Sequence, residues 1–202
     1  MRERPILFNG PLVRAILDGR KSQTRRPIKP QPPWWAEQVH QWARDGARWR
    51  GKIADALWDM RCPYGQPGDH LWVRETWADT SFDWEWGTKQ EAVYRATDTE
   101  YGGPWRPSIH MPRWASRITL EVTDVRVERV QEIWTDHKGS SDPWCDIFAE
   151  GIPQEAVWDG TGAMPTPLSL FIQLWNSIYA KRGLGWDANP WVFAVSFRRI
   201  RP

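Results

Sequence analysis

The longest alternating stretch of this chain, residues 117–130, constrains its fold more than any other feature. From Ile118 to Val122, apolar residues alternate with polar ones, as on a β-strand that buries one face. The alternation slips at residues 123–124 and resumes at Val125, which predicts a bulge or a tight bend. The chain is therefore predicted to be rich in β-structure.

Shorter elements are expected on both sides of this strand. Asn9 can cap a helix that ends at Gly19, and Thr166 with Pro167 opens a second helix with apolar residues at helical spacing. Several separated strands with two or three helices between them predict an α+β fold, a small mixed β-barrel with flanking helices. Strands are expected at residues 6–8, 71–77, 92–95 and 191–197, a helical turn at 146–150, loops at 78–90 and 99–113, and residues 34–60 can hold a further helix.

The domain organisation follows from the length and from two segments that lack a core pattern. A chain of 202 residues fits one domain with insertions. Residues 27–62 begin in a proline-rich connector and continue as a polar segment with recurrent tryptophan, and residues 78–113 are rich in turn-forming residues. We therefore expect a single domain over residues 1–202, with 27–62 and 78–113 as insertions.

The chain is unusually rich in tryptophan and arginine. Its 17 Trp residues exceed what one core needs, so some indole rings are expected on grooves or half-exposed faces. Only six of the 27 basic residues are lysine, and the planar guanidinium of arginine binds phosphates and stacks on rings. The net charge of +2 excludes a polybasic tail. This composition suits planar anionic partners, although the codon usage of a GC-rich genome would also explain it.

Several other classes of site are not predicted. The two cysteines are too few for a disulfide scaffold, and the four histidines show no metal-ligand spacing with them. The sequence has no phosphate-binding glycine loop, dinucleotide fingerprint or nucleophile elbow. Its first residues do not resemble a signal peptide, and no apolar run reaches the length of a membrane span. We expect a cytoplasmic, monomeric protein without a metal, a cofactor or a membrane partner.

A cluster of cations follows the first predicted helix. Arg20, Lys21, Arg25 and Arg26 lie within seven residues. Such a cluster attracts phosphate or another anion. The alternative is a solvated basic loop without a ligand. The same segment, residues 19–26, also carries the hydroxyls of Ser22 and Thr24 and is predicted to form the lip of a site for a nucleotide-like ligand.

Lys21 and Thr24 form a candidate reactive pair. They are three residues apart, so a turn could bring the ammonium and the hydroxyl together. The flanking arginines disfavour a protonated lysine and lower its pKa. A neutral Lys21 could then take the proton of Thr24 and make its oxygen a nucleophile.

Two carboxylates are candidates for a third member of this site. Glu75 shares a face of its predicted strand with apolar residues, where a carboxylate is unusual, and the alternative is a structural ion pair with Arg74 or Arg95. Glu150 precedes Gly151 at the end of the predicted helical turn, and the alternative is a surface residue. The residues alone do not separate the two.

Three tryptophans are candidates for stacking on a base. Trp72, Trp77 and Trp114 lie near arginine-rich strand ends, and Arg74 is close to the first two in sequence. The tryptophans nearer the end of the chain are expected to lie mostly in the core. These residues predict binding of RNA or DNA, with arginine on phosphates and indole on bases.

These motifs resemble those of a known family. Residues 19–26 resemble the G-x-K-x-x-[E/T]-x-R signature of ASCH domains, which are relatives of the PUA fold. Residues 68–75 resemble the strand that follows the signature, and residues 191–197 resemble the closing strand. Residues 118–130 and 149–151 resemble the family's next strand and its "AEG" turn, and the tryptophan-rich insertions with residues 105–117 resemble phage and prophage members.

The resemblance implies a small PUA-like β-barrel with a cleft beside residues 19–26, and a role with RNA, nucleotides or modified nucleosides. Small bacterial members with threonine in the signature are similar to amidohydrolases that remove the acetyl group from N4-acetylcytidine. Their lysine, threonine and glutamate match Lys21, Thr24 and Glu150. This chain is much larger than those enzymes, so its insertions can cover or reshape the cleft.

Three hypotheses follow. In the first, the protein hydrolyses N4-acylated cytidine, with Thr24 as nucleophile, Lys21 as base, Glu150 orienting the pair and Arg26 with backbone N–H groups stabilising the oxyanion. In the second, it binds a modified nucleoside or single-stranded nucleic acid without catalysis. In the third, it is a phage accessory protein that binds a host protein through its insertions. The residues expected to contact the ligand are Arg20, Ser22, Arg25, Arg26, Trp72, Arg74, Glu75 and Trp77.

Overall fold

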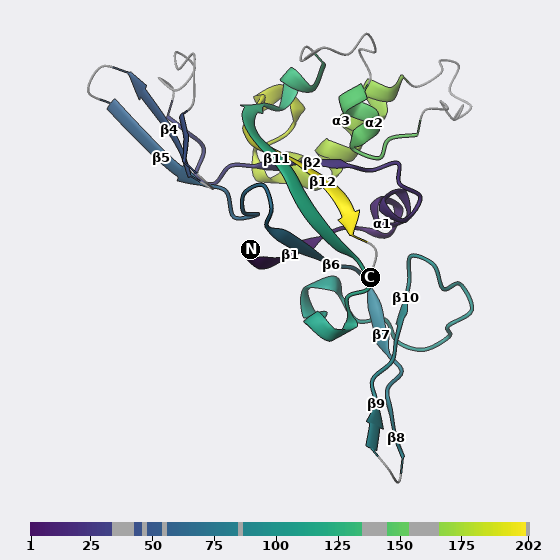
Figure 1. Ribbon diagram of the computed structural model, residues 1–202. Helices are drawn as coiled ribbons and strands as arrows, with labels where there is room; N and C mark the ends of the chain where they lie inside the picture. Colours follow the sequence, from purple (N-terminus) through teal and green to yellow (C-terminus); the bar gives the residue numbers. More distant parts are fainter. Residues whose placement is uncertain are drawn as a thin grey trace.

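A five-stranded mixed sheet forms the centre of this α+β fold (Figure 1). The computed structural model describes residues 1–33, 43–45, 48–53, 56–84, 87–134, 145–153 and 166–200. The spatial order of the strands is β1-β6-β11-β12-β2, and only β1 and β6 pair in parallel. Their bounds are β1 Glu3–Leu7, β2 Gln23–Pro27, β6 His70–Arg74, β11 Thr119–Arg129 and β12 Trp191–Ile200.

The sheet is open, so the expected α+β class is confirmed but a closed barrel is not seen. Within the described residues, the edge strands β1 and β2 share no ladder of backbone hydrogen bonds. A side chain bridges the gap instead. The Nη2 of Arg26 donates to the carbonyl of Leu7 at 2.6 Å, and the Arg26 guanidinium lies 5.2 Å from the ring centre of Phe8.

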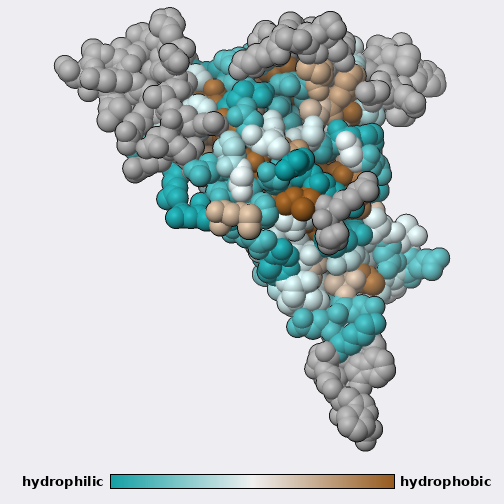
Figure 2. All heavy atoms as spheres, in the orientation of Figure 1, coloured by the Kyte–Doolittle hydropathy of each residue, from teal (hydrophilic) through white to brown (hydrophobic). Residues whose placement is uncertain are grey.

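Two apolar clusters lie on opposite faces of the sheet. Successive residues of a strand point to opposite faces, so Phe193 and Val195 of β12 belong to one cluster and Val192 belongs to the other. The helix α1 (Gly10–Leu17) packs on the first cluster, and α3 (Pro167–Tyr179) packs on the second. The face of the molecule shown in Figure 2 is mostly hydrophilic where it is coloured, with small separated hydrophobic areas.

Both long helices begin where local signals predict. The side chain of Asn9 accepts a hydrogen bond from the N–H of Leu12 at 3.1 Å, and the Thr166 side chain caps α3 in the same way. Gly19 has a φ of +76°, a left-handed conformation that ends the turn after α1. None of the described helices has the length and apolar character needed to span a membrane. The short helices are α2 Cys145–Ala149 and the 3-10 helices η2 Ser108–His110, η3 Arg113–Ala115, η4 Val130–Trp134, η5 Ala180–Arg182 and η6 Trp186–Ala188.

The strand predictions are confirmed in part. The register of β11 shifts between Val122 and Asp124, where the slip in alternation predicts a bulge. The predicted strand over residues 71–77 is instead divided, because the chain bends after β6. The next strand, β7 (Trp77–Asp79), leaves the main sheet and pairs with β10 (Ala92–Tyr94).

Two small antiparallel sheets extend from opposite ends of the main sheet (Figure 1). The sequence predicts a helix within residues 34–60 and a loop over 78–90, and both predictions are wrong for the described residues, which form strands. Each strand pairs only within its own sheet. The rest of residues 34–60 lies outside the described residues. The bounds are β3 Ala43–Asp45, β4 Arg48–Ile53 and β5 Ala56–Arg61 in one sheet, and β8 Phe82–Trp84 and β9 Gly87–Lys89 in the other. Trp49 of β4 and Met60 of β5 lie opposite each other and are buried against the main apolar cluster.

Candidate functional site

The candidate site lies where the chain enters β2 and meets the end of α2. Lys21 and Glu150, 129 residues apart in sequence, form an isolated antiparallel bridge. Beside it, the N–H of Ser22 donates to the carbonyl of Ala149 at 2.9 Å. The bridge therefore joins the basic segment to the turn that follows α2.

The turn that presents Glu150 requires a glycine. Gly151 has a φ of +85°, which L-residues rarely adopt. A Cβ at this position would lie 3.0 Å from the Cβ of Ala15 and 3.1 Å from the Cβ of Lys21. The backbone of the turn thus packs directly against α1 and Lys21, which fixes the position of the Glu150 side chain relative to Lys21.

The ammonium of Lys21 is buried and fully hydrogen-bonded. Its Nζ donates to the carbonyl of Gln23 at 2.6 Å, to the carbonyl of Glu150 at 2.8 Å and to Oε2 of Glu150 at 3.0 Å. An ammonium has three protons, so these acceptors use all of them. The side chain of Lys21 is 1% exposed. In this arrangement Lys21 is the cation of a buried ion pair.

The pKa of Lys21 is lowered from its ordinary value, mainly by burial. The Glu150 carboxylate opposes this shift by charge and by its hydrogen bond, and the cations of Arg26 and Arg25 add smaller lowering effects. The direction agrees with the sequence-based expectation. The cause differs, because loss of water contributes more than the neighbouring arginines.

Thr24 does not join the pair. It lies in the extended strand β2 opposite Val195, and opposed residues of an antiparallel pair share a face. Val195 belongs to the main apolar cluster, so Thr24, 3% exposed, faces the core. Within the described part of the chain, no hydrogen bond joins its hydroxyl to Lys21. The turn expected to bring these residues together is a strand, and that expectation is wrong.

Arg25 is the centre of a buried cluster of charges. Its Nε donates to Oε1 of Glu128 at 2.8 Å, its Nη2 to Oδ2 of Asp146 at 2.8 Å and its Nη1 to Oε1 of Glu150 at 3.2 Å. Burial alone would lower the pKa of Arg25, but these carboxylates raise it. The charge cluster consists of Lys21, Arg25, Arg126, Glu128, Asp146 and Glu150.

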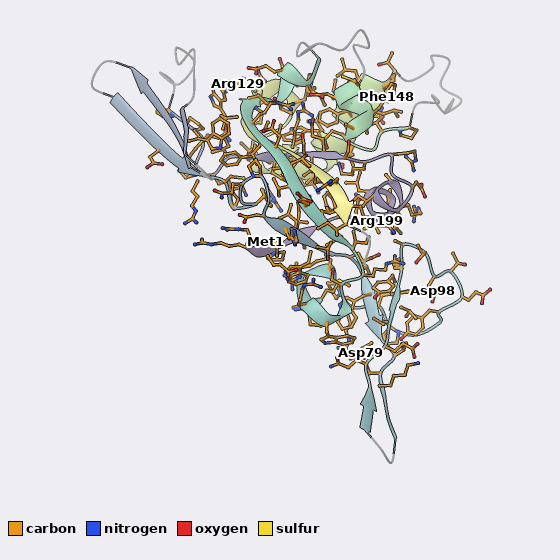
Figure 3. All side chains as sticks on the ribbon, in the orientation of Figure 1. Met1, Asp79, Asp98, Arg129, Phe148 and Arg199 are labelled. Carbon is orange, nitrogen blue, oxygen red and sulfur yellow. The ribbon has the colours of Figure 1, made fainter. Side chains whose placement is uncertain are left out.

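The sheet leaves room for this charge cluster at Ala194. In the register of the sheet, Ala194 of β12 lies between Arg126 of β11 and Arg25 of β2. All three side chains therefore share one face, and the central methyl leaves space for the two guanidinium groups. The charge cluster lies on the side of the sheet that faces α2, which contributes Asp146. In Figure 3, Phe148 of α2 and Arg129 of β11 lie at the same end of the molecule.

The charge cluster corrects one predicted role and adds residues that sequence reasoning missed. Arg25 was expected to contact a ligand, but its side chain is enclosed by protein at 0% exposure. Glu128, Asp146 and Arg126 were not predicted as part of a site. The available signal was the alternation of Arg126 and Glu128 on one face of a largely buried strand.

The carboxylate of Glu75 lies elsewhere. Its two oxygens accept from Nε and Nη2 of Arg117 at 2.9 and 3.0 Å, and the residue is 1% exposed. The structural ion pair considered from the sequence exists, but with Arg117 rather than with Arg74 or Arg95. Of the two candidate carboxylates, only Glu150 contacts Lys21.

The predicted stacking residues are not beside Lys21 either. Trp77 is 1% exposed and packs edge-on against Trp114, 5.6 Å between ring centres, so its expected role on a base is not possible in this arrangement. Trp72 is half-buried, with the guanidinium of Arg74 5.3 Å from its ring centre. Trp72 and Arg74 belong to β6, and in the main sheet the strands β11 and β12 separate β6 from β2.

Two other residues of the basic segment, Arg20 and Ser22, face solvent. Arg20 is exposed and pairs with Asp18 at 2.9 Å. Ser22 is exposed, with its backbone held by Ala149. In the described structure, no side-chain hydrogen bond or ion pair joins either residue to the charge cluster. Both remain accessible to a ligand, but they do not enclose one.

A pocket of about 460 Å³ lies beside the edge strand β2. Arg26 contributes to its wall, whereas Lys21, Thr24 and Glu150 are not among its lining residues. The lining comes from β2 and the residues after it, from β5, from α3 with η5, and from β12. The residues are Arg26, Pro27, Ile28, Lys29, Pro30, Asp59, Met60, Arg61, Pro63, Tyr64, Tyr179, Arg182 and Phe193.

No family model matches this sequence, no curated protein matches it, and no solved structure matches its fold. The charge cluster and the pocket are therefore the features of the molecule that bear on its function. In the part of the chain that the structure describes, no group of His, Cys, Asp and Glu is arranged to hold a metal ion. The charge cluster and the pocket provide guanidinium, ammonium, carboxylate and aromatic groups.

Proposed function

We propose that this protein binds a nucleotide-like ligand, a modified nucleoside or a nucleotide of single-stranded nucleic acid, in the pocket beside Arg26. The composition of the lining carries the proposal, because four cationic residues, one carboxylate and three aromatic rings surround a single cavity. A cavity of about 460 Å³ is in the range that holds one small ligand. Guanidinium groups suit phosphates, and aromatic rings suit bases.

Arg26 is held in place before any ligand arrives. Its Nη2 is fixed on the carbonyl of Leu7, and its Nη1 lies 3.4 Å from the hydroxyl of Tyr179. Burial raises the pKa of Tyr64, and the charge of Arg26 opposes this shift, so the phenol and the guanidinium lie near each other. A preorganised wall of this kind reduces the entropy lost on binding.

The open sheet is consistent with a PUA-like barrel of the ASCH type whose seam is closed by side chains. The Arg26 to Leu7 contact spans the two edge strands. Lys21 lies near the same seam, with its ammonium 5.5 Å from the ring centre of Phe8. Both residues occupy positions of the ASCH signature, which supports this assignment as part of the proposal.

Binding can be tested by fluorescence anisotropy with labelled single-stranded RNA and DNA. We expect affinity to fall steeply between about 50 and 200 mM salt, because phosphate contacts release counterions. Tyr64→Ala should weaken binding by about tenfold, as expected for the loss of a stacking surface. Tyr101→Ala, outside the pocket, is the matched control. Equal affinities of the two variants would contradict the proposed site.

Amide hydrolysis of N4-acylated cytidine is the second candidate function. The contact between Lys21 and Glu150 and the lowered pKa of Lys21 favour it. It ranks second because the Thr24 hydroxyl has no hydrogen bond to Lys21 in the described structure.

The hydrolysis of N4-acetylcytidine can be followed by mass spectrometry. Thr24→Val keeps the shape of a core-facing residue while removing the hydroxyl, so the variant should fold and lose all turnover if Thr24 is the nucleophile. Equal turnover by wild type and variant would exclude this mechanism.

A further inference from the structure

In the part of the chain that the structure describes, three cations at the mouth of the Arg26 pocket have no partner. Lys29, Arg61 and Arg182 line the pocket and are exposed. Among the described residues, no carboxylate, carbonyl or aromatic ring contacts their charged groups. They come from the segment after β2, the end of β5 and η5, which are distant in sequence and meet at this opening.

This convergence is not a general property of the surface. Arg113 pairs with Glu3 at 3.0 Å, and Arg20 pairs with Asp18 at 2.9 Å, although all four side chains are substantially exposed. The formal net charge is only +2, so the chain has nearly enough carboxylates to pair its cations. At this opening the cationic residues outnumber the single carboxylate, Asp59, and this excess of positive charge favours an anion at that place.

The inner part of the pocket has the opposite character. Phe193 is 2% exposed and Tyr179 is 6% exposed, and the half-buried ring of Tyr64 lies beside them in the lining. Ile28 and Met60 are also buried there. A ligand that fits both parts has a planar, weakly polar portion for the inner wall and a compact anionic group for the mouth.

We propose that this pocket recognises a phosphomonoester, so that the ligand is a nucleoside monophosphate, either free or as the phosphorylated end of an oligonucleotide. This inference rests on the proposed function and adds which anion is bound. A phosphomonoester carries a charge of about −1.5 to −2 at neutral pH. An internal phosphodiester carries one charge. Three unpaired cations around one opening match the more highly charged group, and the cavity accommodates one nucleotide.

Isothermal titration calorimetry with matched ligands tests the inference. AMP, CMP, GMP and UMP are compared with their four nucleosides, and a short RNA with a 5′-phosphate is compared with the same RNA lacking it. We expect at least one monophosphate to bind about tenfold or more tighter than its nucleoside. The two RNA arms show whether a terminal phosphate is also accepted, which identifies the source of the group.

Two double variants with the same loss of charge provide the residue-level test. Arg61→Gln with Arg182→Gln removes two cations of the mouth and should abolish the preference for the monophosphate while leaving nucleoside affinity within about twofold. Arg95→Gln with Lys181→Gln removes two exposed cations that do not line the pocket, one of them adjacent to Arg182, and should leave the preference intact.

The pH dependence supplies an independent readout. The charged groups facing the ligand are Arg26, Lys29, Asp59, Arg61 and Arg182, with the phenols of Tyr64 and Tyr179, and no histidine is among the lining residues. The phosphate becomes a dianion near a pKa of about 6, so monophosphate affinity should rise between about pH 5 and pH 7.5.

The outcomes separate the two proposals. Equal affinity for nucleoside and monophosphate, or equal effects of the two double variants, would overturn the phosphomonoester inference and leave the nucleotide-like ligand in place. Absence of binding for every ligand would overturn both. A monophosphate preference that survives the Arg61 and Arg182 substitutions would place the phosphate outside this pocket and would also overturn the inference.

Discussion

At the scale of single residues, Arg25 holds together three carboxylates that would otherwise repel one another in a buried place. Glu128, Asp146 and Glu150 each contact its guanidinium. Arg25→Leu would keep much of the volume but leave these carboxylates partly unpaired. We expect the free energy of unfolding to fall by about 3–5 kcal/mol, measured by urea denaturation.

The control for this substitution is Arg20→Leu. Arg20 pairs only with Asp18, and both side chains are about half exposed. An exposed pair contributes little, so the change in unfolding free energy should stay within about 0.5 kcal/mol. Similar losses in the two variants would show that the charge cluster does not stabilise the fold in the way its geometry indicates.

The role of Arg25 also shows where prediction from sequence ends. A run of cations after a helix predicts the lip of a ligand site or, as the alternative, a solvated basic loop, and Arg20 and Ser22 do face solvent. The alternation of β2 determines which side chains turn inward. The carboxylates that meet Arg25 come from positions more than 100 residues away, so only the tertiary fold reveals the cluster.

At the scale of elements, the turn after α2 couples that helix to the basic segment. Gly151→Ala would place a Cβ against Ala15 and Lys21 in a left-handed conformation. We expect a loss of about 1–3 kcal/mol in stability. Hydrogen exchange of residues 145–151 should accelerate, because the turn that anchors α2 is strained. Gly102→Ala, where a Cβ would meet no atom within 4 Å, is the control.

The elements that were predicted correctly have strong local signals. The caps of α1 and α3 and the bulge of β11 are encoded within a few residues and are present in the structure. The strands of the two small sheets were missed because they are only three to six residues long, so no long run of alternation marks them. The split between β6 and β7 was missed because the alternation from Leu71 to Trp77 continues through the bend.

At the scale of the whole molecule, the pocket is assembled from segments that no local pattern connects. Asp59, Met60 and Arg61 come from β5, within the expected insertion 27–62, while Arg26 belongs to the main sheet and Tyr179 to α3. These residues of the expected insertion therefore contribute directly to the candidate ligand site. The resemblance to ASCH domains predicts a site that joins Lys21, Thr24 and Glu150, and the structure brings Lys21 to Glu150 but not to Thr24. It also implies that the insertions can reshape the cleft, but it did not predict which residues form this wall.

Cys62 reports on the main apolar cluster as a whole. It is fully buried within that cluster, and burial raises the pKa of its thiol to about 11 from an ordinary value of 9.0. Between these values the unfolded chain loses the proton while the folded chain keeps it. The contribution of Cys62 to stability is therefore present below about pH 9 and is lost as the pH rises toward about 11.

The measurement is the free energy of unfolding as a function of alkaline pH for wild type and Cys62→Ala. The lowered pKa of Lys21 acts with the opposite sign in part of this range, since the unfolded chain binds its proton more tightly. This effect is common to both proteins and cancels in their difference. We expect the wild-type curve to fall more steeply, by up to about 2–3 kcal/mol across the interval. Parallel curves would show that the thiol ionises as readily in the folded protein as in the unfolded chain, which would contradict its place in a closed core.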